Sequence, residues 1–99
     1  MRELIVNLNK HFENRIRLGI MSMLMVNDWV DFNLMKETLS ITDGNLASHM
    51  KALETENYIE IKKQFIGKKP NTTYRATIEG RKAFNEHLLT LEKLIKSGK

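Results

Sequence analysis

The chain has 99 residues, the size of one domain that can bury a modest core without cross-links, and its formal net charge is +4. It contains no cysteine, which excludes disulfides and thiolate metal sites. The longest apolar run, residues 18–26, is too short to span a membrane, and residues 1–4 include an acid where a secretion signal carries only positive charge. A cytoplasmic protein formed by one domain, residues 1–99, is therefore expected.

The charge is unevenly distributed. Residues 1–57 carry six Lys or Arg side chains against eight Asp or Glu, whereas residues 58–99 carry ten against four. Within the second half, residues 62–75 hold five basic side chains and no acid. Such a segment favours a polyanionic partner, although lysine-rich surfaces are common and this signal alone is weak.

The first third of the chain predicts helices. Apolar residues recur at helical spacing over residues 4–12 and again over residues 16–24, which indicates a short N-terminal helix and a first core helix, separate or continuous. Residues 27–28 are expected to end the core helix. Residues 29–32 have a β-rich composition and predict a short strand that pairs with a later hairpin.

Two more helices are expected around a tight turn at residues 40–41. Asn33 is suited to cap the first helix, which ends at Leu39. The inward side chains predicted for that helix are Leu34, Met35 and Leu39. Thr42 is suited to cap the second helix, residues 42–56, by accepting the backbone N–H of Asn45.

The second of these helices has two unlike sides. One side is a predicted core stripe made of Leu46, Met50, Leu53 and Asn57. The other side carries nothing bulky, so the wall of a groove can approach it closely. Its residues are Gly44, Asn45, Ser48, Lys51, Ala52 and Thr55.

A hairpin and a long helix complete the chain. Residues 58–66 alternate as a half-buried strand does, residues 67–71 supply a loop, and residues 73–78 return. The predicted inward residues of the two strands are Ile59, Ile61, Phe65, Tyr74, Ala76 and Ile78. Thr77 is expected to cap the final helix, residues 79–97.

Three ordered motifs follow this pattern: Thr42-x-Gly44-Asn45-Leu46-x-x-His49-Met50-x-x-Leu53-Glu54 before Tyr58-Ile59, then Phe65-x-Gly67-Lys68-x-Pro70-x-Thr72-x-Tyr74, and Thr77-x-x-Gly80-Arg81-x-Ala83-Phe84. With the element order, they resemble the winged helix-turn-helix transcriptional regulators, in particular the small MarR-like or ArsR-like branch, over about residues 12–88. The resemblance implies a mostly helical α+β fold with a three-helix core, a small antiparallel β-wing and a long C-terminal helix. It also implies a homodimeric bacterial DNA-binding protein, whereas composition and periodicity alone indicate only a basic α+β module.

In such a domain the second helix, about residues 42–56, lies in the major groove. Asn45 is the first candidate to read a base, because its amide can donate and accept in one plane against adenine; it could instead be a polar first-turn residue. Ser48 and His49 are the next candidates, although a lone helical histidine is more often a flanking residue. Gly44 would permit close approach of a phosphate, or it is merely a tolerated glycine.

The wing, residues 62–75, is expected to contact phosphates or the minor groove. The alternative is a hairpin tip kept polar for solubility. Lysines on the two helices are either phosphate contacts or solvated residues. The complete set of predicted DNA-binding residues is Thr42, Gly44, Asn45, Ser48, His49, Lys51, Lys36, Lys68, Lys69, Thr72, Thr73 and Arg75.

The terminal helices, within residues 1–12 and 79–97, carry more apolar residues than a core of this size requires. A subunit interface is predicted there, with the alternative that both segments only cover their own core. Its predicted residues are Leu4, Ile5, Leu8, Phe84, Leu88, Leu91 and Ile95. A two-fold dimer would place two second helices about 34 Å apart, over a near-palindromic operator.

The three histidines are widely separated, and no phosphate loop or nucleophile motif is present. No enzyme activity, metal, cofactor or assignable small-molecule effector is therefore predicted. The leading hypothesis is a homodimeric, sequence-specific regulator of transcription that binds double-stranded DNA, of the repressor type. The alternative is a winged-helix protein–protein interaction module that uses the same surfaces without binding DNA.

Overall fold

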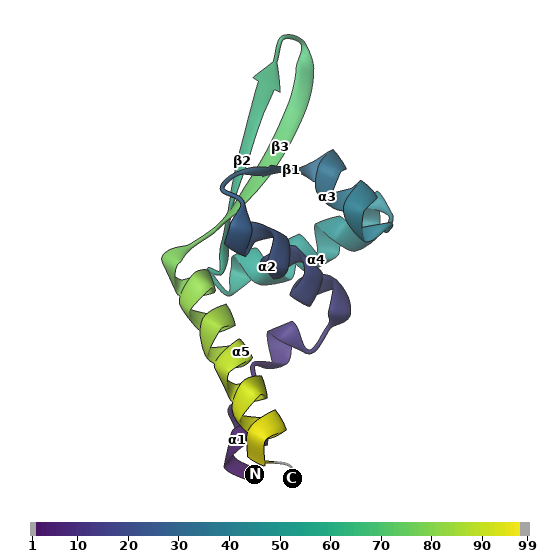
Figure 1. Cartoon of the computed structure of the whole chain (residues 1–99). Coiled ribbons are helices and arrows are strands. Elements are labelled where there is room, and N and C mark those ends of the chain that lie inside the picture. Colours follow the sequence, from purple (N-terminus) through teal and green to yellow (C-terminus); the bar gives the residue numbers. More distant parts are fainter. Residues whose placement is uncertain (1, 98–99) are drawn as a thin grey trace.

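The computed structural model describes residues 2–97, and their elements follow the predicted order with one added turn of 3-10 helix. The elements are α1 (Arg2–Val6), η1 (Lys10–Phe12), α2 (Arg15–Val26), β1 (Val30–Asp31), α3 (Phe32–Leu39), α4 (Asp43–Thr55), β2 (Ile59–Ile66), β3 (Lys69–Ala76) and α5 (Ile78–Ser97). The hairpin β2–β3 projects from one end of the molecule and α5 from the other, so the protomer measures 56 × 26 × 21 Å (Figure 1). The predicted winged helix-turn-helix fold is confirmed.

Asparagine caps separate the N-terminal helices. The side chain of Asn9 accepts the N–H of His11 at 2.9 Å and begins η1. The side chain of Asn14 accepts two N–H groups at the start of α2, including that of Ile16 at 2.8 Å. Because each N-cap residue is non-helical and starts a new helix, the two predicted helices are separate rather than continuous.

The start of α3 differs from the prediction. Asp31, not Asn33, is the N-cap, because its carboxylate accepts the N–H groups of Asn33 at 2.8 Å and Leu34 at 3.2 Å. The helix therefore begins at Phe32, and the strand before it is reduced to β1. Met35 is buried as predicted, but the inward placement of Leu34 is wrong, since its side chain is exposed.

Helix α4 is capped as predicted, with Thr42 Oγ1 accepting the N–H of Asn45 at 3.2 Å. Its predicted stripe is buried except for Asn57, which is exposed and has a left-handed φ of 62°. Asparagine tolerates this conformation, so Asn57 ends the helix instead of extending the core. The buried residues of the stripe are Leu46, Met50 and Leu53.

The sheet has the order β1-β3-β2 and is antiparallel. Ile59 faces Ala76 across the hairpin, and these two side chains close the core together with Tyr74. The inward placement of Phe65 and Ile78 is wrong, since they are 73% and 85% exposed. Phe65 lies where the strands run beyond the core, and Ile78 begins α5.

The second strand of the wing begins four residues earlier than predicted, at Lys69, and ends at Ala76. The predicted loop, residues 67–71, reduces to a turn at residues 67–68 in which Gly67 has a φ of 65°, a left-handed value that glycine adopts freely. Residues from Lys69 onward already belong to β3.

One short stretch joins α4, the hairpin and α5; we call residues 57–58 together with 77–80 the α4–α5 junction. Thr77 Oγ1 donates to the carbonyl of Asn57 at 2.7 Å and accepts the N–H of Gly80 at 2.9 Å, which confirms Thr77 as the cap of α5. The N–H of Thr77 donates to the carbonyl of Tyr58 at 3.0 Å. Gly80 is buried against the same carbonyl.

The junction leads to a stability prediction. A Cβ at Gly80 would collide with the backbone of Tyr58, so Gly80→Ala should lower the free energy of unfolding by about 1–3 kcal/mol or more. Gly44 is the matched control, because nothing lies within 4 Å of its Cβ position, and Gly44→Ala should stabilise the helix by up to about 1 kcal/mol. Urea unfolding followed by circular dichroism measures both stabilities. Equal stabilities of the two variants would contradict the close packing of Gly80 against Tyr58.

Candidate nucleic-acid interface

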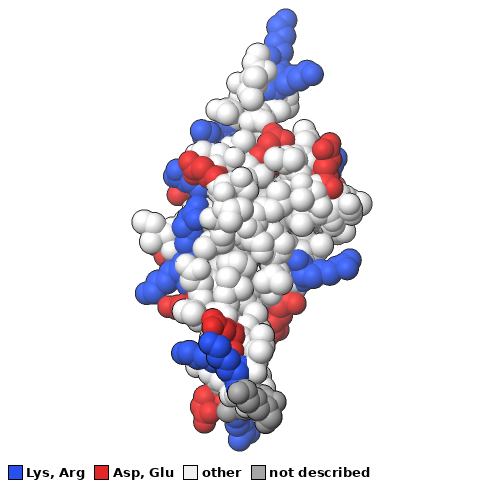
Figure 2. Space-filling model, in the orientation of Figure 1, with Lys and Arg blue, Asp and Glu red and all other residues white. Residues whose placement is uncertain are grey.

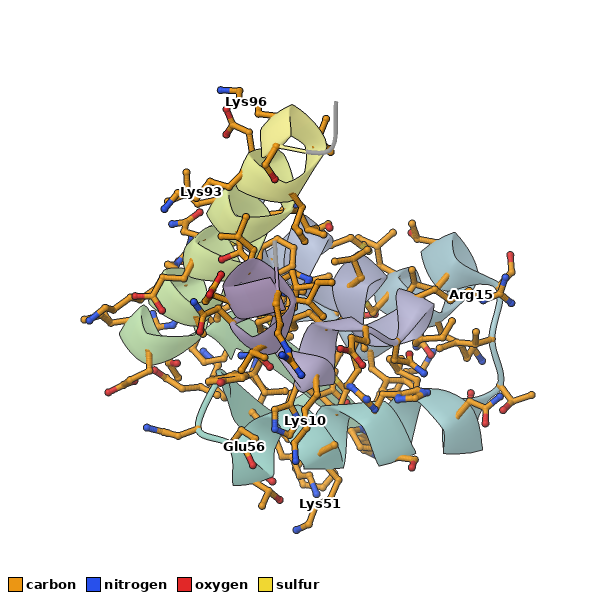
Figure 3. The ribbon with its side chains drawn as sticks, turned by 90° about the horizontal axis from the view of Figure 1, so that it is seen from below. Lys10, Arg15, Lys51, Glu56, Lys93 and Lys96 are labelled. Atoms are coloured by element: carbon orange, nitrogen blue, oxygen red, sulfur yellow. The ribbon has the colours of Figure 1, made fainter. Side chains whose placement is uncertain are left out.

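The outer side of α4 is open. Gly44, Asn45 and Ser48 are exposed on its first two turns, with the hydroxyl of Thr42 already engaged as the cap. Lys51, one turn further on, points away from the body of the molecule on the outer side of the helix (Figure 3). The structure therefore leaves a slim, polar helix face free to approach another surface.

His49 is held by a residue that the sequence did not indicate. Arg17 of α2 places its Nη1 3.1 Å from His49 Nδ1, and its Nε donates to the carbonyl of His11 at 2.6 Å. Because a guanidinium only donates, Nδ1 must accept and the remaining ring proton sits on Nε2. Burial, followed by repulsion from Arg17, lowers the pKa of His49 below its ordinary value of 6.5.

Two of the candidate lysines have acidic neighbours. Lys36 Nζ lies 2.8 Å from Asp43 Oδ1 at the start of α4, and this hydrogen-bonded pair raises the pKa of Lys36. Lys51 Nζ lies 3.9 Å from Glu54 Oε1, a loose contact that leaves most of the lysine exposed. Asp43, which would repel a phosphate at the helix N-terminus, is thus partly neutralised by Lys36.

The far end of the wing is basic and carries no acid. Lys68 and Lys69 lie at its turn and are exposed, as are Lys62 and Lys63 further down β2. In the face seen in Figure 2, the charged side chains at the tip are all blue, and acidic groups begin only where the hairpin meets the body. A tip of this kind attracts a polyanion over a distance set by the ionic strength.

The base of the wing has a different chemistry, because acids already contact Arg75. Its guanidinium lies 3.0 Å from Glu60 and 3.8 Å from Asp28, and it stacks 4.5 Å from the ring centroid of Trp29. Lys62 contacts the same ring at 4.7 Å. Sequence reasoning missed Trp29; an aromatic residue in the strand expected to pair with a basic hairpin was the available signal.

The two predicted threonines of the wing lie in unlike places. Thr72 lines a shallow groove, whereas the Thr73 hydroxyl is buried without a hydrogen-bond partner among the described residues. The groove joins α4 to the hairpin, and its other polar or charged lining residues include Lys51, Glu54 and Lys63. The structure therefore brings the outer edge of α4 and one face of the wing to a common surface.

The predicted interface residues lie mainly where α1 packs beside α5 (Figure 1). Ile5, Leu88 and Ile95 are exposed, and Leu4, Leu8 and Leu91 are partly so. Phe84 belongs instead to the protomer's own core, where its ring contacts that of Phe12 edge to face with centroids 5.2 Å apart.

Within residues 2–97, no three His, Cys, Asp or Glu side chains are grouped closely enough to bind a metal ion. None of the helices in this part of the chain combines the length and the apolar character that crossing a membrane requires.

Comparisons with known proteins agree with this geometry. A family model described as a winged helix DNA-binding domain matches residues 16–95. An uncharacterized protein of Methanocaldococcus jannaschii is 35% identical over 88 residues, which cover 89% of this chain and 96% of that protein.

The chain is also similar to proteins of known structure. A transcriptional regulator homologue protein from Pyrococcus horikoshii OT3 is 31% identical, with a TM-score of 0.86, and the match covers 97% of this chain and 96% of that one. A MarR family transcriptional regulator from Silicibacter pomeroyi has a TM-score of 0.64 at 10% identity, covering 98% of this chain and 70% of that one, and shares the fold alone.

The contact between Arg17 and His49 yields a prediction about proton affinity. Arg17→Met removes the positive charge but keeps an aliphatic side chain, so the pKa of His49 should rise towards 6.5 while burial keeps it below that value. A titration of the His49 ring by NMR measures this shift. An unchanged His49 pKa in Arg17→Met would show that the guanidinium does not act on the ring.

Proposed function

The chain belongs to the winged helix DNA-binding domain family, and on that premise we propose that it is a homodimeric regulator that binds duplex DNA in a sequence-specific manner. Its fold is that of transcriptional regulators and not of enzymes. The observation that carries the proposal is the open outer side of α4 together with a wing tip that has lysines and no acid. The helix and the wing share one groove, which Lys51 and Lys63 line. Occupation of an operator by the dimer would repress transcription there.

We place α4 in the major groove, with Asn45 and Ser48 at the base edges. Both are exposed in the first two turns of the helix, the part that reaches bases when such a helix docks. Asn45 can pair with adenine through two hydrogen bonds. His49 contributes its Nε2–H as a donor to a base or phosphate acceptor, because Arg17 occupies the other nitrogen.

We assign the phosphate contacts to the exposed lysines, Lys51 on α4 and Lys68 and Lys69 on the wing. Arg75 instead braces the base of the hairpin through Glu60 and Asp28. Thr72 faces the groove and remains a candidate contact.

The dimer is proposed from the surface of α1 and α5. The solvent-accessible surface of the protomer is 6740 Å², against about 5,800 Å² expected for a compact protein of this mass. The excess is consistent with a projecting hairpin and with a long α5 that extends from the body. Leu88, Leu89 and Ile95 are exposed on α5, and Ile5 and Val6 on α1. Burying such a surface against a second copy would stabilise a two-fold dimer.

Base reading by Asn45 can be separated from general attraction to DNA. Asn45→Ala should weaken binding to the preferred duplex by about 1–3 kcal/mol and leave binding to random duplex nearly unchanged. Duplexes selected from a random pool supply the preferred site, and fluorescence anisotropy measures both affinities.

The double variant Lys68→Ala, Lys69→Ala is the contrasting control. It should weaken binding to both duplexes alike and flatten the dependence of log affinity on log salt by about 1 per charge removed. Equal losses on the two duplexes in Asn45→Ala would remove that residue from base reading. Undetectable or salt-insensitive binding by the unaltered protein would support the interaction-module alternative.

The proposed interface can be tested by introducing a charged residue into it. Leu88→Glu should convert the dimer to monomers in analytical ultracentrifugation, because a carboxylate would lose its hydration inside an apolar contact. Ile78→Glu is the matched control, because Ile78 is exposed at the first residue of α5, away from α1, and its substitution should leave the mass unchanged. A dimer that persists in Leu88→Glu would refute this interface.

A further inference from the structure

Two apolar residues, Phe65 and Ile66, lie near the exposed tip of the wing, where polar side chains would be expected. Phe65 is 73% exposed and Ile66 is 63% exposed, and both directly precede the turn at the tip of the hairpin. The core ends further back, near Ile61 and Tyr74, so neither side chain stabilises the fold by burial in the protomer. Lys63 precedes the two residues in β2, and Lys68 and Lys69 follow them at the turn, all three exposed.

The register fixes the face on which Phe65 lies. Phe65 is opposite Pro70, Lys63 is opposite Thr72, and Ile61 is opposite Tyr74. Since alternate residues of a strand share a face, these three pairs lie on one side of the hairpin. Nearer the body, the same side lines the groove shared with α4, so Phe65 extends the surface to which α4 contributes.

The other side of the hairpin differs in chemistry. It carries Lys62 and Arg75, which stack on Trp29, and Asn71, whose side-chain amide donates to Asp31 at 2.7 Å. Those contacts tie that side to the body of the molecule. The side that bears Phe65 is left free at the tip.

The charge around Phe65 identifies what can cover it. Phe65 shares its side of the hairpin with Lys63 and lies next to the turn lysines, Lys68 and Lys69. These positive charges make contact with a basic surface unfavourable and contact with a polyanion favourable. Duplex DNA offers both phosphates for the lysines and an apolar stack of bases for the ring. Apolar side chains presented in the minor groove enter between base pairs and kink the duplex by about 20–90°.

We propose that Phe65, backed by Pro70, is a wedge that enters a base step from the minor groove and bends the DNA. The inference rests on the proposed function and adds that the protein bends the DNA it binds. Sites with a flexible pyrimidine–purine step under the wing would then bind more tightly, although no side chain reads those bases. The lysines neutralise the phosphates drawn together by the bend.

Bending is measured by energy transfer between dyes on the two ends of a duplex chosen from a random pool, with affinity measured on the same duplex. The unaltered protein should bend it by at least about 20°. Phe65→Ala should abolish the bend and weaken binding about tenfold, the loss expected when one stacking side chain is truncated. Ile78→Ala, which also shortens an exposed apolar side chain, should change neither quantity.

Two substitutions separate the wedge from charge. Phe65→Leu keeps an apolar side chain and should retain part of the bend. Phe65→Lys adds a positive charge and should still lose the bend, even if the new charge maintains affinity for phosphates.

The outcomes distinguish the inference from its premise. Normal affinity and an unchanged bend in Phe65→Ala would overturn the wedge while leaving the DNA-binding function intact; the exposed Phe65 ring would then fit an apolar surface on a protein. An unbent duplex with the unaltered protein would also overturn it. No binding to any duplex would overturn the wedge together with the proposed function.

Discussion

The arrangement of this domain depends on the α4–α5 junction. Within six residues, the hydroxyl and N–H of Thr77 bond to the carbonyls of Asn57 and Tyr58, and Gly80 allows α5 to contact that backbone directly. The end of α4, the start of β2 and the end of β3 all meet there. A shift at this point would therefore move the wing and the proposed dimer helix relative to α4. The proposed contact of α4 and the wing with DNA at the same time depends on their fixed spacing.

Charge is organised as a gradient along the hairpin. At the base, Arg75 is shared between Glu60, Asp28 and the face of Trp29, so its charge serves the fold. At the tip, Lys68 and Lys69 have no acidic neighbour within the hairpin and their charge is available to a partner. The same contrast exists on the helices, where Asp43 holds Lys36 while Lys51 extends into solvent.

Local features of the fold could be predicted from the sequence because they depend on near neighbours. Thr42 caps a helix through a residue three positions away, and the burial of Leu46, Met50 and Leu53 follows from helical period. Contacts such as that of Arg17 with His49, 32 positions apart, have no local signal. The alternation of apolar and polar residues that predicted Phe65 inward does not show where the core ends, because a strand alternates in the same way beyond the core.

The short third strand determines how the wing behaves mechanically. β1 pairs with β3 only at Tyr74 and Thr73, and the side-chain bond from Asn71 to Asp31 is the outermost link to the body among the hydrogen bonds of the described residues. Further out, the wing is a ribbon of two strands without a third strand beside it, and two strands alone are only marginally stable. If the wing contacts DNA as proposed, its outer part would adjust to grooves of unequal width, and half-sites that differ in local shape would be bound by one protein.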